Sequence, residues 1–442
     1  MTRIENDTIF AIASGAGRAA IAVLRVSGPA TRQIVEGVSG LLPEPRTATL
    51  KTFRDPATGE AIDKGFVIFF AAPKTYTGED YAEFHIHGGR AVVAGMVKVI
   101  GGGAGTRPAE PGEFTRRAML NGKMDLAAVE GLADLIDAET ECQRRAAFRQ
   151  AQGVLGRQAA IWRRALLEAA ALLEAEIDFP EEEGVPGISG RRAAQILAPV
   201  LAGLKSELAT GRAGERLREG ATVVIAGPPN AGKSTLLNAL ACRDVAIVSP
   251  FEGTTRDIIE VHLDLGGCPV SLIDTAGLRE SFDAVEKIGI LRTKVKAEAA
   301  DLVLWLSEAC APLPPGVQGG EVWPVFTKSD LLSSADRQSL AGELYICAES
   351  GENLDHLLKK MEDFARASMS DGHAGLIARE RHRKAFEAAA RALERILADP
   401  DAPAELLAED LRAATVSLQR LTGAVDVEEI LGEIFARFCI GK

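Results

Sequence analysis

The segment most able to do chemistry is a glycine-rich run, Gly227-Pro-Pro-Asn-Ala-Gly-Lys233-Ser234. It follows a strand-like apolar run, residues 222–226, and precedes a helical pattern, which is the context that a phosphate-binding loop requires. Glycines let backbone N–H groups converge on phosphate oxygens, Lys233 can reach the β and γ phosphates, and Ser234 can bind Mg²⁺. A purely structural turn would not need this lysine and this serine, so the run predicts nucleotide binding.

Three further motifs stand where a GTP site needs them. Asp274-Thr-Ala-Gly277 ends an apolar strand, so its aspartate can reach the Mg²⁺ shell and its glycine N–H the γ phosphate. Gly253-Thr-Thr255 lies between the glycine-rich run and the next strand, where a threonine can bind the metal. Thr327-Lys-Ser-Asp330 follows another strand, and its aspartate can accept the two guanine donors that adenine lacks. Each motif is weak alone, but the four in this order predict a GTP site.

One position departs from the usual GTPase pattern. Ras-type GTPases place a glutamine directly after the last glycine of the aspartate motif to orient the attacking water, whereas this chain has Leu278. Another polar group must therefore orient the water, and the acidic candidates downstream are Glu280, Asp283 and Glu286. The positive charge of an arginine finger can come from a partner's arginine or from a bound monovalent cation, and the spacing does not decide between them.

The elements that position these motifs form an interrupted pattern. Alternating strands and helices over residues 216–370 predict a mostly parallel sheet, with one antiparallel edge strand at the Gly266-Gly267 turn. Residues 123–215 and 371–442 share an Ala/Leu/Glu/Arg composition at helical spacing, so we expect one helical domain with the α/β domain inserted. Residues 1–122, with short strand-like runs and Gly/Pro turns, predict a separate α+β domain.

Composition excludes several classes of protein. Of 442 residues, 47% are apolar and 25% charged, which is typical of folded globular domains. The longest apolar run, residues 66–73, is too short to span a membrane, and Glu5 and Asp7 stand where a signal peptide would be basic and apolar, so we expect a cytoplasmic protein. The six cysteines lack zinc spacing.

The net charge of −12 argues against bulk attraction to nucleic acid, so any RNA contact requires a local basic patch. Candidates are the arginine pairs at 116–117, 144–145 and 163–164 and the run 379–384, although paired arginines on helices usually form solvated faces.

Stretches outside the GTP motifs carry a resemblance to the MnmE (TrmE) family of tRNA-modification GTPases. They are Asp7-Thr-Ile-Phe-Ala-Ile, Leu24-Arg-Val-Ser-Gly28, Tyr76-Thr-Gly-Glu-Asp80 leading to His87-Gly-Gly89, Pro111-Gly-Glu-Phe-Thr-Arg-Arg117, Leu120-Asn-Gly-Lys-Met-Asp-Leu126 and Phe438-Cys-Ile-Gly-Lys442. The resemblance implies an α+β N-terminal folate-binding and dimerisation domain (1–122), an all-α helical domain in two segments (123–215 and 371–442) and an inserted α/β Ras-like P-loop G domain (216–370).

The resemblance also implies an activity. Members of the family look like potassium-activated GTPases that form homodimers and act with the FAD-containing partner MnmG in a heterotetramer or larger complex, with FAD only in the partner. Together they add an aminomethyl or carboxymethylaminomethyl group to C5 of the wobble uridine, position 34, of certain tRNAs. The one-carbon unit comes from 5-formyl- or 5,10-methylene-tetrahydrofolate, and K⁺ and Mg²⁺ are the metal cofactors.

The family's site residues carry over as follows. The water-orienting glutamate falls on Glu286, which answers the question raised by Leu278. Cys439 is either a catalytic residue of the modification or a buried structural thiol. K⁺ ligands fall on Asn230, Ser249, Phe251 and Thr254, Mg²⁺ ligands on Ser234 and Thr255, and folate contacts on Arg25, Glu83 and Lys123 with Lys442 close by. GTP contacts fall on Asn230, Ala231, Gly232, Lys233, Ser234, Thr235, Ser249, Pro250, Phe251, Glu252, Gly253, Thr254, Thr255, Asp274, Thr275, Ala276, Gly277, Thr327, Lys328, Ser329 and Asp330.

Two motifs depart from the family pattern. Thr327 replaces the usual asparagine of the guanine motif, which predicts weaker guanine binding, and Cys347-Ala348 replaces the supporting Ser-Ala pair, a smaller change.

Two alternative functions remain. A GTP-switched RNA-binding scaffold with a vestigial folate fold would fit the same G motifs, and a test of folate binding distinguishes it from the tRNA-modification enzyme. A folate enzyme with a silent G domain is disfavoured, because the chain has all five of the residues Lys233, Ser234, Thr255, Asp274 and Glu286.

Overall fold

The computed structural model describes most of the chain and divides it into two compact units. The described residues are 7–15, 17–178, 189–243, 245–247, 260–274, 300–308, 320–333, 337–338, 342–369, 375–423, 432, 434–435, 438 and 441. One unit comprises residues 1–133, 151–161 and 418–442, and the other comprises residues 134–150 and 162–417.

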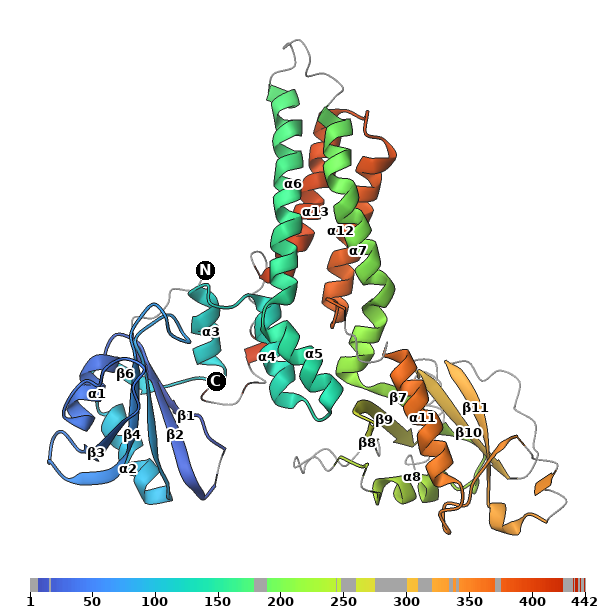
Figure 1. Ribbon diagram of the computed structural model, residues 1–442, viewed down its shortest axis with the longest axis horizontal. Helices are drawn as coiled ribbons and strands as arrows, with labels where there is room; N and C mark the ends of the chain where they lie inside the picture. Colours follow the sequence, from blue (N-terminus) through green and yellow to red (C-terminus); the bar gives the residue numbers. More distant parts are fainter. Residues whose placement is uncertain are drawn as a thin grey trace, which may run out of the picture. The chain divides into compact units, whose positions relative to one another are not determined.

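The first unit is built on a six-stranded sheet in the order β3-β4-β5-β2-β1-β6 (Figure 1). Neighbouring strands are antiparallel except for the parallel pair β1 and β6. The strands are β1 (Thr8–Ile12), β2 (Ala19–Ser27), β3 (Thr49–Arg54), β4 (Ala61–Phe70), β5 (Tyr81–Gly88) and β6 (Thr106–Pro108).

Helices cover the two faces of this sheet unequally. Helices α1 (Thr31–Ser39) and α2 (Arg90–Gly101) pack on the face that carries Leu24 of β2 and Phe84 of β5. Phe114 of α3 (Glu113–Leu120) packs with Ile9 and Tyr81 in a separate cluster on the other face. Because successive strand residues point to opposite faces, Arg25 and Glu83 also lie on that second face.

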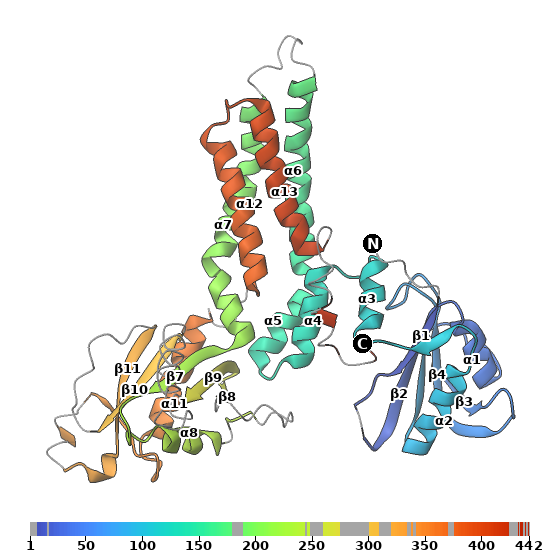
Figure 2. The same cartoon turned by 180° about the vertical axis from the view of Figure 1, so that it is seen from behind.

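Helices from both ends of the second unit form a bundle. Figures 1 and 2 show α6 (Val154–Asp178) and α7 (Ser189–Glu219) beside α12 (Glu380–Ala398) and α13 (Ala404–Thr422). Trp162 of α6 meets Phe386 of α12 edge to face at 5.4 Å between ring centroids. The short helices α4 (Leu126–Asp137) and α5 (Glu141–Ala151) precede the bundle in the chain. Helical segments on either side of the α/β block therefore pack together, which confirms the predicted insertion.

The inserted block is a second six-stranded sheet in the order β12-β11-β10-β7-β9-β8. All neighbours are parallel except β8 and β9, which the Gly266-Gly267 turn joins as an antiparallel hairpin, as predicted. The elements are β7 (Ala221–Ala226), α8 (Lys233–Ala241), β8 (Glu260–Leu265), β9 (Cys268–Asp274), β10 (Leu302–Glu308), β11 (Glu321–Thr327), the 3₁₀ turn η2 (Ser329–Leu331), β12 (Leu344–Tyr345) and α11 (Leu354–Ser368).

Val223 and Val224, neighbours on β7, belong to two separate buried apolar clusters, so both faces of the central strands are buried. Leu236 and Leu240 of α8 and Leu357 and Met361 of α11 pack against the sheet core. Across the described ranges, no helix has the length and the apolar character that a membrane span needs.

Candidate functional site

The phosphate loop, residues 227–234, joins the end of β7 to the first turn of α8. Gly227 has φ +149°, and a Cβ there would lie 2.2 Å from the carbonyl oxygen of Leu306, so only glycine fits. Asn230 and Gly232 also have positive φ, +62° and +86°. These conformations curl the backbone ahead of a helix N-terminus, which is an anion-binding arrangement.

Three side chains of the site converge at the end of this loop. Lys233 Nζ donates hydrogen bonds to the carbonyls of Gly227 (3.0 Å) and Pro228 (2.9 Å), so its ammonium bridges the loop. Burial lowers the pKa of Lys233, while the nearby Asp274 carboxylate acts in the opposite direction. Ser234 Oγ donates to Asp274 Oδ2 at 2.9 Å, and Asp274 is 3% exposed. Two side-chain oxygens, of Ser234 and Asp274, thus lie together beside the phosphate loop, and oxygen atoms are the ligands that Mg²⁺ requires.

Thr327 contacts the phosphate loop directly. Its hydroxyl donates to the carbonyl of Ala231 at 2.9 Å, and its side chain is buried at the end of β11. A threonine in the guanine motif therefore still ties the base-binding segment to the phosphate loop, which sequence reasoning did not foresee.

Neighbouring residues hold the rest of the guanine motif in place. Lys328 has φ +58° and pairs with Glu308, and Ser329 is fully buried with its backbone N–H bonded to Ile346 O at 3.2 Å. Ser329 Oγ donates to Glu352, which also accepts from Arg337. Asp330 is exposed. The backbone supports a carboxylate that faces solvent, where a base can reach it.

Many predicted GTP-site residues lie outside the described residues. They are Ser249, Pro250, Phe251, Glu252, Gly253, Thr254, Thr255, Thr275, Ala276, Gly277 and Glu286. Leu278, Glu280 and Asp283 also lie outside them, as do Cys439 and Lys442 at the C-terminus.

A second polar site lies on the β2–β5 face of the first unit. Arg25 and Glu83 are cross-strand partners, and Arg25 Nε donates to Glu83 Oε1 at 3.2 Å. The Tyr81 hydroxyl donates to the same oxygen at 3.0 Å, and burial raises the pKa of Tyr81. Arg25 Nη1 also donates to the carbonyl of Gly441 at 3.1 Å, which brings residues 416 positions apart together.

Backbone geometry holds the chain end at this site. Gly441 has φ +100°, and a Cβ there would lie 2.4 Å from Ile12 O, so the glycine permits close contact with the end of β1. Nearby in the chain, Phe435 and Phe438 pack with Val129. Gly441 is therefore held beside Arg25.

Three other polar side chains of this unit differ in their surroundings. His85 Nε2 lies 3.5 Å from Glu83 Oε2 and is a buried nitrogen with no hydrogen-bond partner among the described residues. His87 instead pairs with Asp63 at 2.8 Å, so the two histidines serve different carboxylates. Lys123 is exposed, and its ammonium bonds to the carbonyl of Pro73.

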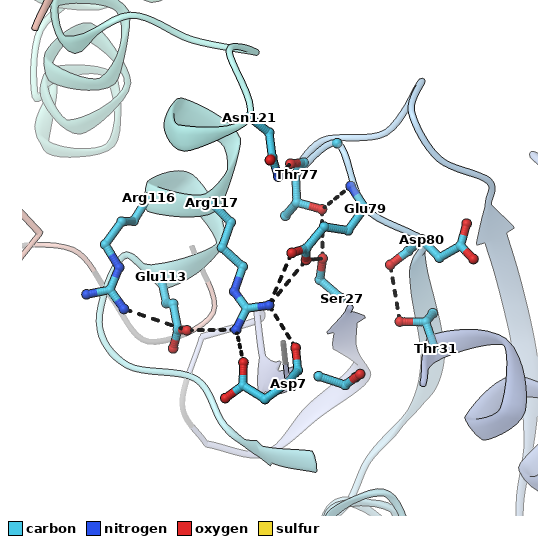
Figure 3. A network of polar contacts seen from close by, with 12 residues as sticks. Asp7, Ser27, Thr31, Thr77, Glu79, Asp80, Glu113, Arg116, Arg117 and Asn121 are labelled. Carbon is cyan, nitrogen blue, oxygen red and sulfur yellow. Dashed lines mark hydrogen bonds and ion pairs between the residues drawn. The ribbon is translucent and has the colours of Figure 1, made fainter. Parts of the chain in front are cut away.

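A buried charge network underlies this unit (Figure 3). Arg117, 3% exposed, donates to Asp7 at 2.6 Å, to Glu113 at 3.1 Å and to Glu79 at 3.3 Å. Glu79 accepts from Ser27 at 2.8 Å. Arg107 also binds Glu113, at 2.7 Å. All of these residues except Arg107 come from stretches that carried the family resemblance, so part of that signature is structural.

Several of the arginines that were candidates for phosphate contacts form ion pairs with carboxylates of this chain. Arg117 belongs to the buried network, and Arg144 and Arg145 both pair with Glu141 at 2.7 Å. Arg379 binds Asp134 at 2.6 Å, beside Arg218, which binds the same carboxylate at 3.0 Å. The expectation of a solvated arginine face is wrong for Arg117.

A phosphate loop on a mostly parallel sheet, with its serine bonded to a strand-end aspartate and a guanine motif behind it, defines a P-loop GTPase domain, here inserted into a helical domain. Family models match on both sides of it: the GTP-binding protein TrmE N-terminus over residues 8–123 and the MnmE helical domain over residues 126–439. The chain belongs to the MnmE family of tRNA modification GTPases, and the predicted enzyme class and fold are confirmed.

Relatives named tRNA modification GTPase MnmE match over nearly the full length. The protein of Beijerinckia indica is 60% identical over 438 residues, 99% of this chain and 96% of its own. That of Rhodopseudomonas palustris strain BisB5 is 50% identical, with 99% of each chain covered. Among solved structures, Era of Aquifex aeolicus bound to GDP·AlF₄⁻ is 27% identical over 33% of this chain and 56% of its own, with a TM-score of 0.26.

Proposed function

We propose that this chain is a cytoplasmic, potassium-activated GTPase that acts as a homodimer with an MnmG-type FAD partner. Together they use a tetrahydrofolate-bound one-carbon unit to add an aminomethyl or carboxymethylaminomethyl group to C5 of the wobble uridine of certain tRNAs. The observation that carries the proposal is the meeting of Arg25, Glu83 and Gly441 in a unit separate from the phosphate loop. We place the domain boundaries at 122, 215 and 370.

The GTP half of the proposal rests on the phosphate loop. Lys233 already bridges loop carbonyls at the place where β and γ phosphates would bind, so it can transfer these bonds to phosphate oxygens. Ser234 and Thr255 would bind Mg²⁺, and Asp274 orients the serine by their 2.9 Å hydrogen bond. Oxygen donors of this kind suit a hard cation. Asp330 would accept from guanine.

The potassium part of the proposal rests on Asn230, whose side chain is exposed at the strained turn of the loop. With Ser249, Phe251 and Thr254, it would hold a cation that supplies the charge of an arginine finger. Glu286 would orient the attacking water, the task that a glutamine performs in Ras-type GTPases at the position of Leu278.

The folate part of the proposal rests on the second polar site. Lys123 and Lys442 would bind the folate carboxylates, Glu83 would accept from the pterin ring, and Arg25, 3.2 Å from Glu83, would contact the same end of the folate. The buried Nε2 of His85, beside Glu83, has no hydrogen-bond partner in the described part of the chain, which suits a site for a polar ligand. The bound tetrahydrofolate derivative supplies the one-carbon unit, and Cys439 would act in the modification near the anchored Gly441.

Mass spectrometry of wobble uridines tests the proposal. A deletion strain should lose the C5 modification, the wild-type gene should restore it, and Arg25→Ala should fail to restore it. Arg54→Ala is the matched control, because this exposed arginine lies on β3 and donates to the carbonyl of Gly59, five positions along the chain. Full modification in the deletion strain, with GTP hydrolysis intact in the purified protein, would instead favour a GTP-switched RNA scaffold.

A further inference from the structure

Two cysteines meet where the helical segment touches the inserted sheet. Cys142, the second residue of α5, and Cys268, the first residue of β9, lie 126 positions apart in the chain, yet their sulfurs are 3.8 Å apart. The backbone N–H of Cys142 donates to the carbonyl of Gly267 at 3.0 Å, so the two main chains are also held together. Both residues belong to the same compact unit.

The two thiols differ in environment. Cys268 is 1% exposed, and burial, together with the adjacent Cys142, raises the pKa of its thiol to about 12. Cys142 is partly exposed. A small oxidant dissolved in water therefore meets Cys142 first, and Cys268 is placed to react second, which is the usual arrangement of an attacking and a resolving thiol.

We propose that Cys142 and Cys268 are a redox-active pair that closes to a disulfide when a low-molecular-weight disulfide acts as oxidant. The Cys142 thiolate attacks one sulfur of the oxidant, forms a mixed disulfide and releases one small thiol. Cys268 then loses its proton to solvent and displaces the second small thiol. Two electrons pass from the cysteines to the oxidant, and the sulfurs move about 2 Å closer to reach disulfide bond length.

The closed pair would tie two parts of the unit together. Gln143, next to Cys142, donates to the carbonyl of Arg218 at the end of α7 at 3.0 Å, so α5 is fixed to the helical segment. Cys268 begins the strand that ends at Asp274 beside Ser234. A disulfide would therefore hold the β8–β9 hairpin against α5 and resist any displacement of the sheet from the helices. This inference does not depend on the proposed folate chemistry.

Thiol counting and peptide mapping of the full-length protein test the pair. After incubation with oxidised glutathione, the number of thiols titrated in denaturant should fall from six to four, since the chain has six cysteines. Mapping without reductant should show a cross-linked peptide that contains Cys142 and Cys268, and dithiothreitol should restore all six thiols. Cys142→Ser and Cys268→Ser should each lose that cross-link, whereas Cys242→Ser, an exposed cysteine in the same unit, should keep it.

Hydrogen exchange tests the mechanical consequence. Oxidation should slow amide exchange at least about threefold in residues 141–151 and 260–274 of the wild type and leave Cys268→Ser unchanged. A mixed disulfide that stays on Cys142, or cross-links only through Cys242, would overturn the proposal. Unchanged exchange in the cross-linked protein would overturn the tether.

Discussion

Ser234 donates a hydrogen bond to Asp274 over 2.9 Å, which joins the start of α8 to the end of β9. The two residues are 40 positions apart and meet because β7 and β9 are adjacent parallel strands, whose carboxyl ends lie at the same edge of the sheet. This contact holds the Asp274 carboxylate at the first turn of the helix that follows the phosphate loop.

Replacing Asp274 by asparagine should raise the Mg²⁺ concentration needed for half-maximal GTP hydrolysis by about tenfold or more, because a carboxylate that supports the metal shell is lost. A magnesium titration of phosphate release measures this. Asp355→Asn, at an exposed carboxylate on α11, should leave the requirement unchanged. An unaltered requirement in Asp274→Asn would exclude the role.

Replacing Glu286 by alanine should leave GTP binding unchanged and slow hydrolysis about 100-fold, because the attacking water loses its guide. Fluorescent-nucleotide binding and single-turnover hydrolysis separate the two steps. Glu280→Ala and Asp283→Ala are the matched comparisons. If either of them slows hydrolysis while Glu286→Ala hydrolyses GTP at the wild-type rate, the water-orienting role belongs to that residue instead of Glu286.

Exchange of K⁺ for Na⁺ should reduce the hydrolysis rate at least about tenfold if a bound cation supplies the missing positive charge. In Asn230→Ala, the two salts should give similar, slow rates. Hydrolysis rates at constant ionic strength provide the measurement. Equal rates in both salts for the wild type would argue for an arginine from a partner instead.

Replacing Arg117 by methionine should lower the free energy of unfolding by about 3–5 kcal/mol, because three carboxylates lose their shared, buried cation. Arg116→Met is the control, since Arg116 is 41% exposed and should cost less than about 1 kcal/mol. Denaturant unfolding followed by circular dichroism compares them. Similar losses in both variants would mean that the network does not hold the unit together.

Stability should also fall in acid through Glu113. Burial by itself raises the pKa of Glu113, but hydrogen bonds from Arg107, from the Glu110 N–H and from Arg117 outweigh it and lower the pKa to about 2, from an ordinary 4.5. A lowered carboxyl pKa stabilises the fold above pH 4.5, and this contribution is lost as the pH falls from 4.5 toward 2. Glu113→Gln should flatten the unfolding free energy over that range, whereas Glu110→Gln, at an exposed carboxylate, should not.

Local patterns were sufficient for three features of the G domain. The phosphate loop, the aspartate at the end of β9 and the hairpin at Gly266-Gly267 follow from short-range rules, because backbone conformation and strand order constrain which residue types can stand there. The interrupted helical domain was also predictable, since its two segments share one composition.

Long-range contacts were decided only by the tertiary structure. No spacing rule brings Gly441 to Arg25, places Arg117 among three carboxylates, turns the Thr327 hydroxyl to Ala231, or sets Cys142 against Cys268. Local motifs are visible in the sequence because one short segment satisfies its own geometry. Contacts between distant segments depend on how whole sheets and helices pack, and this information is distributed over the entire chain.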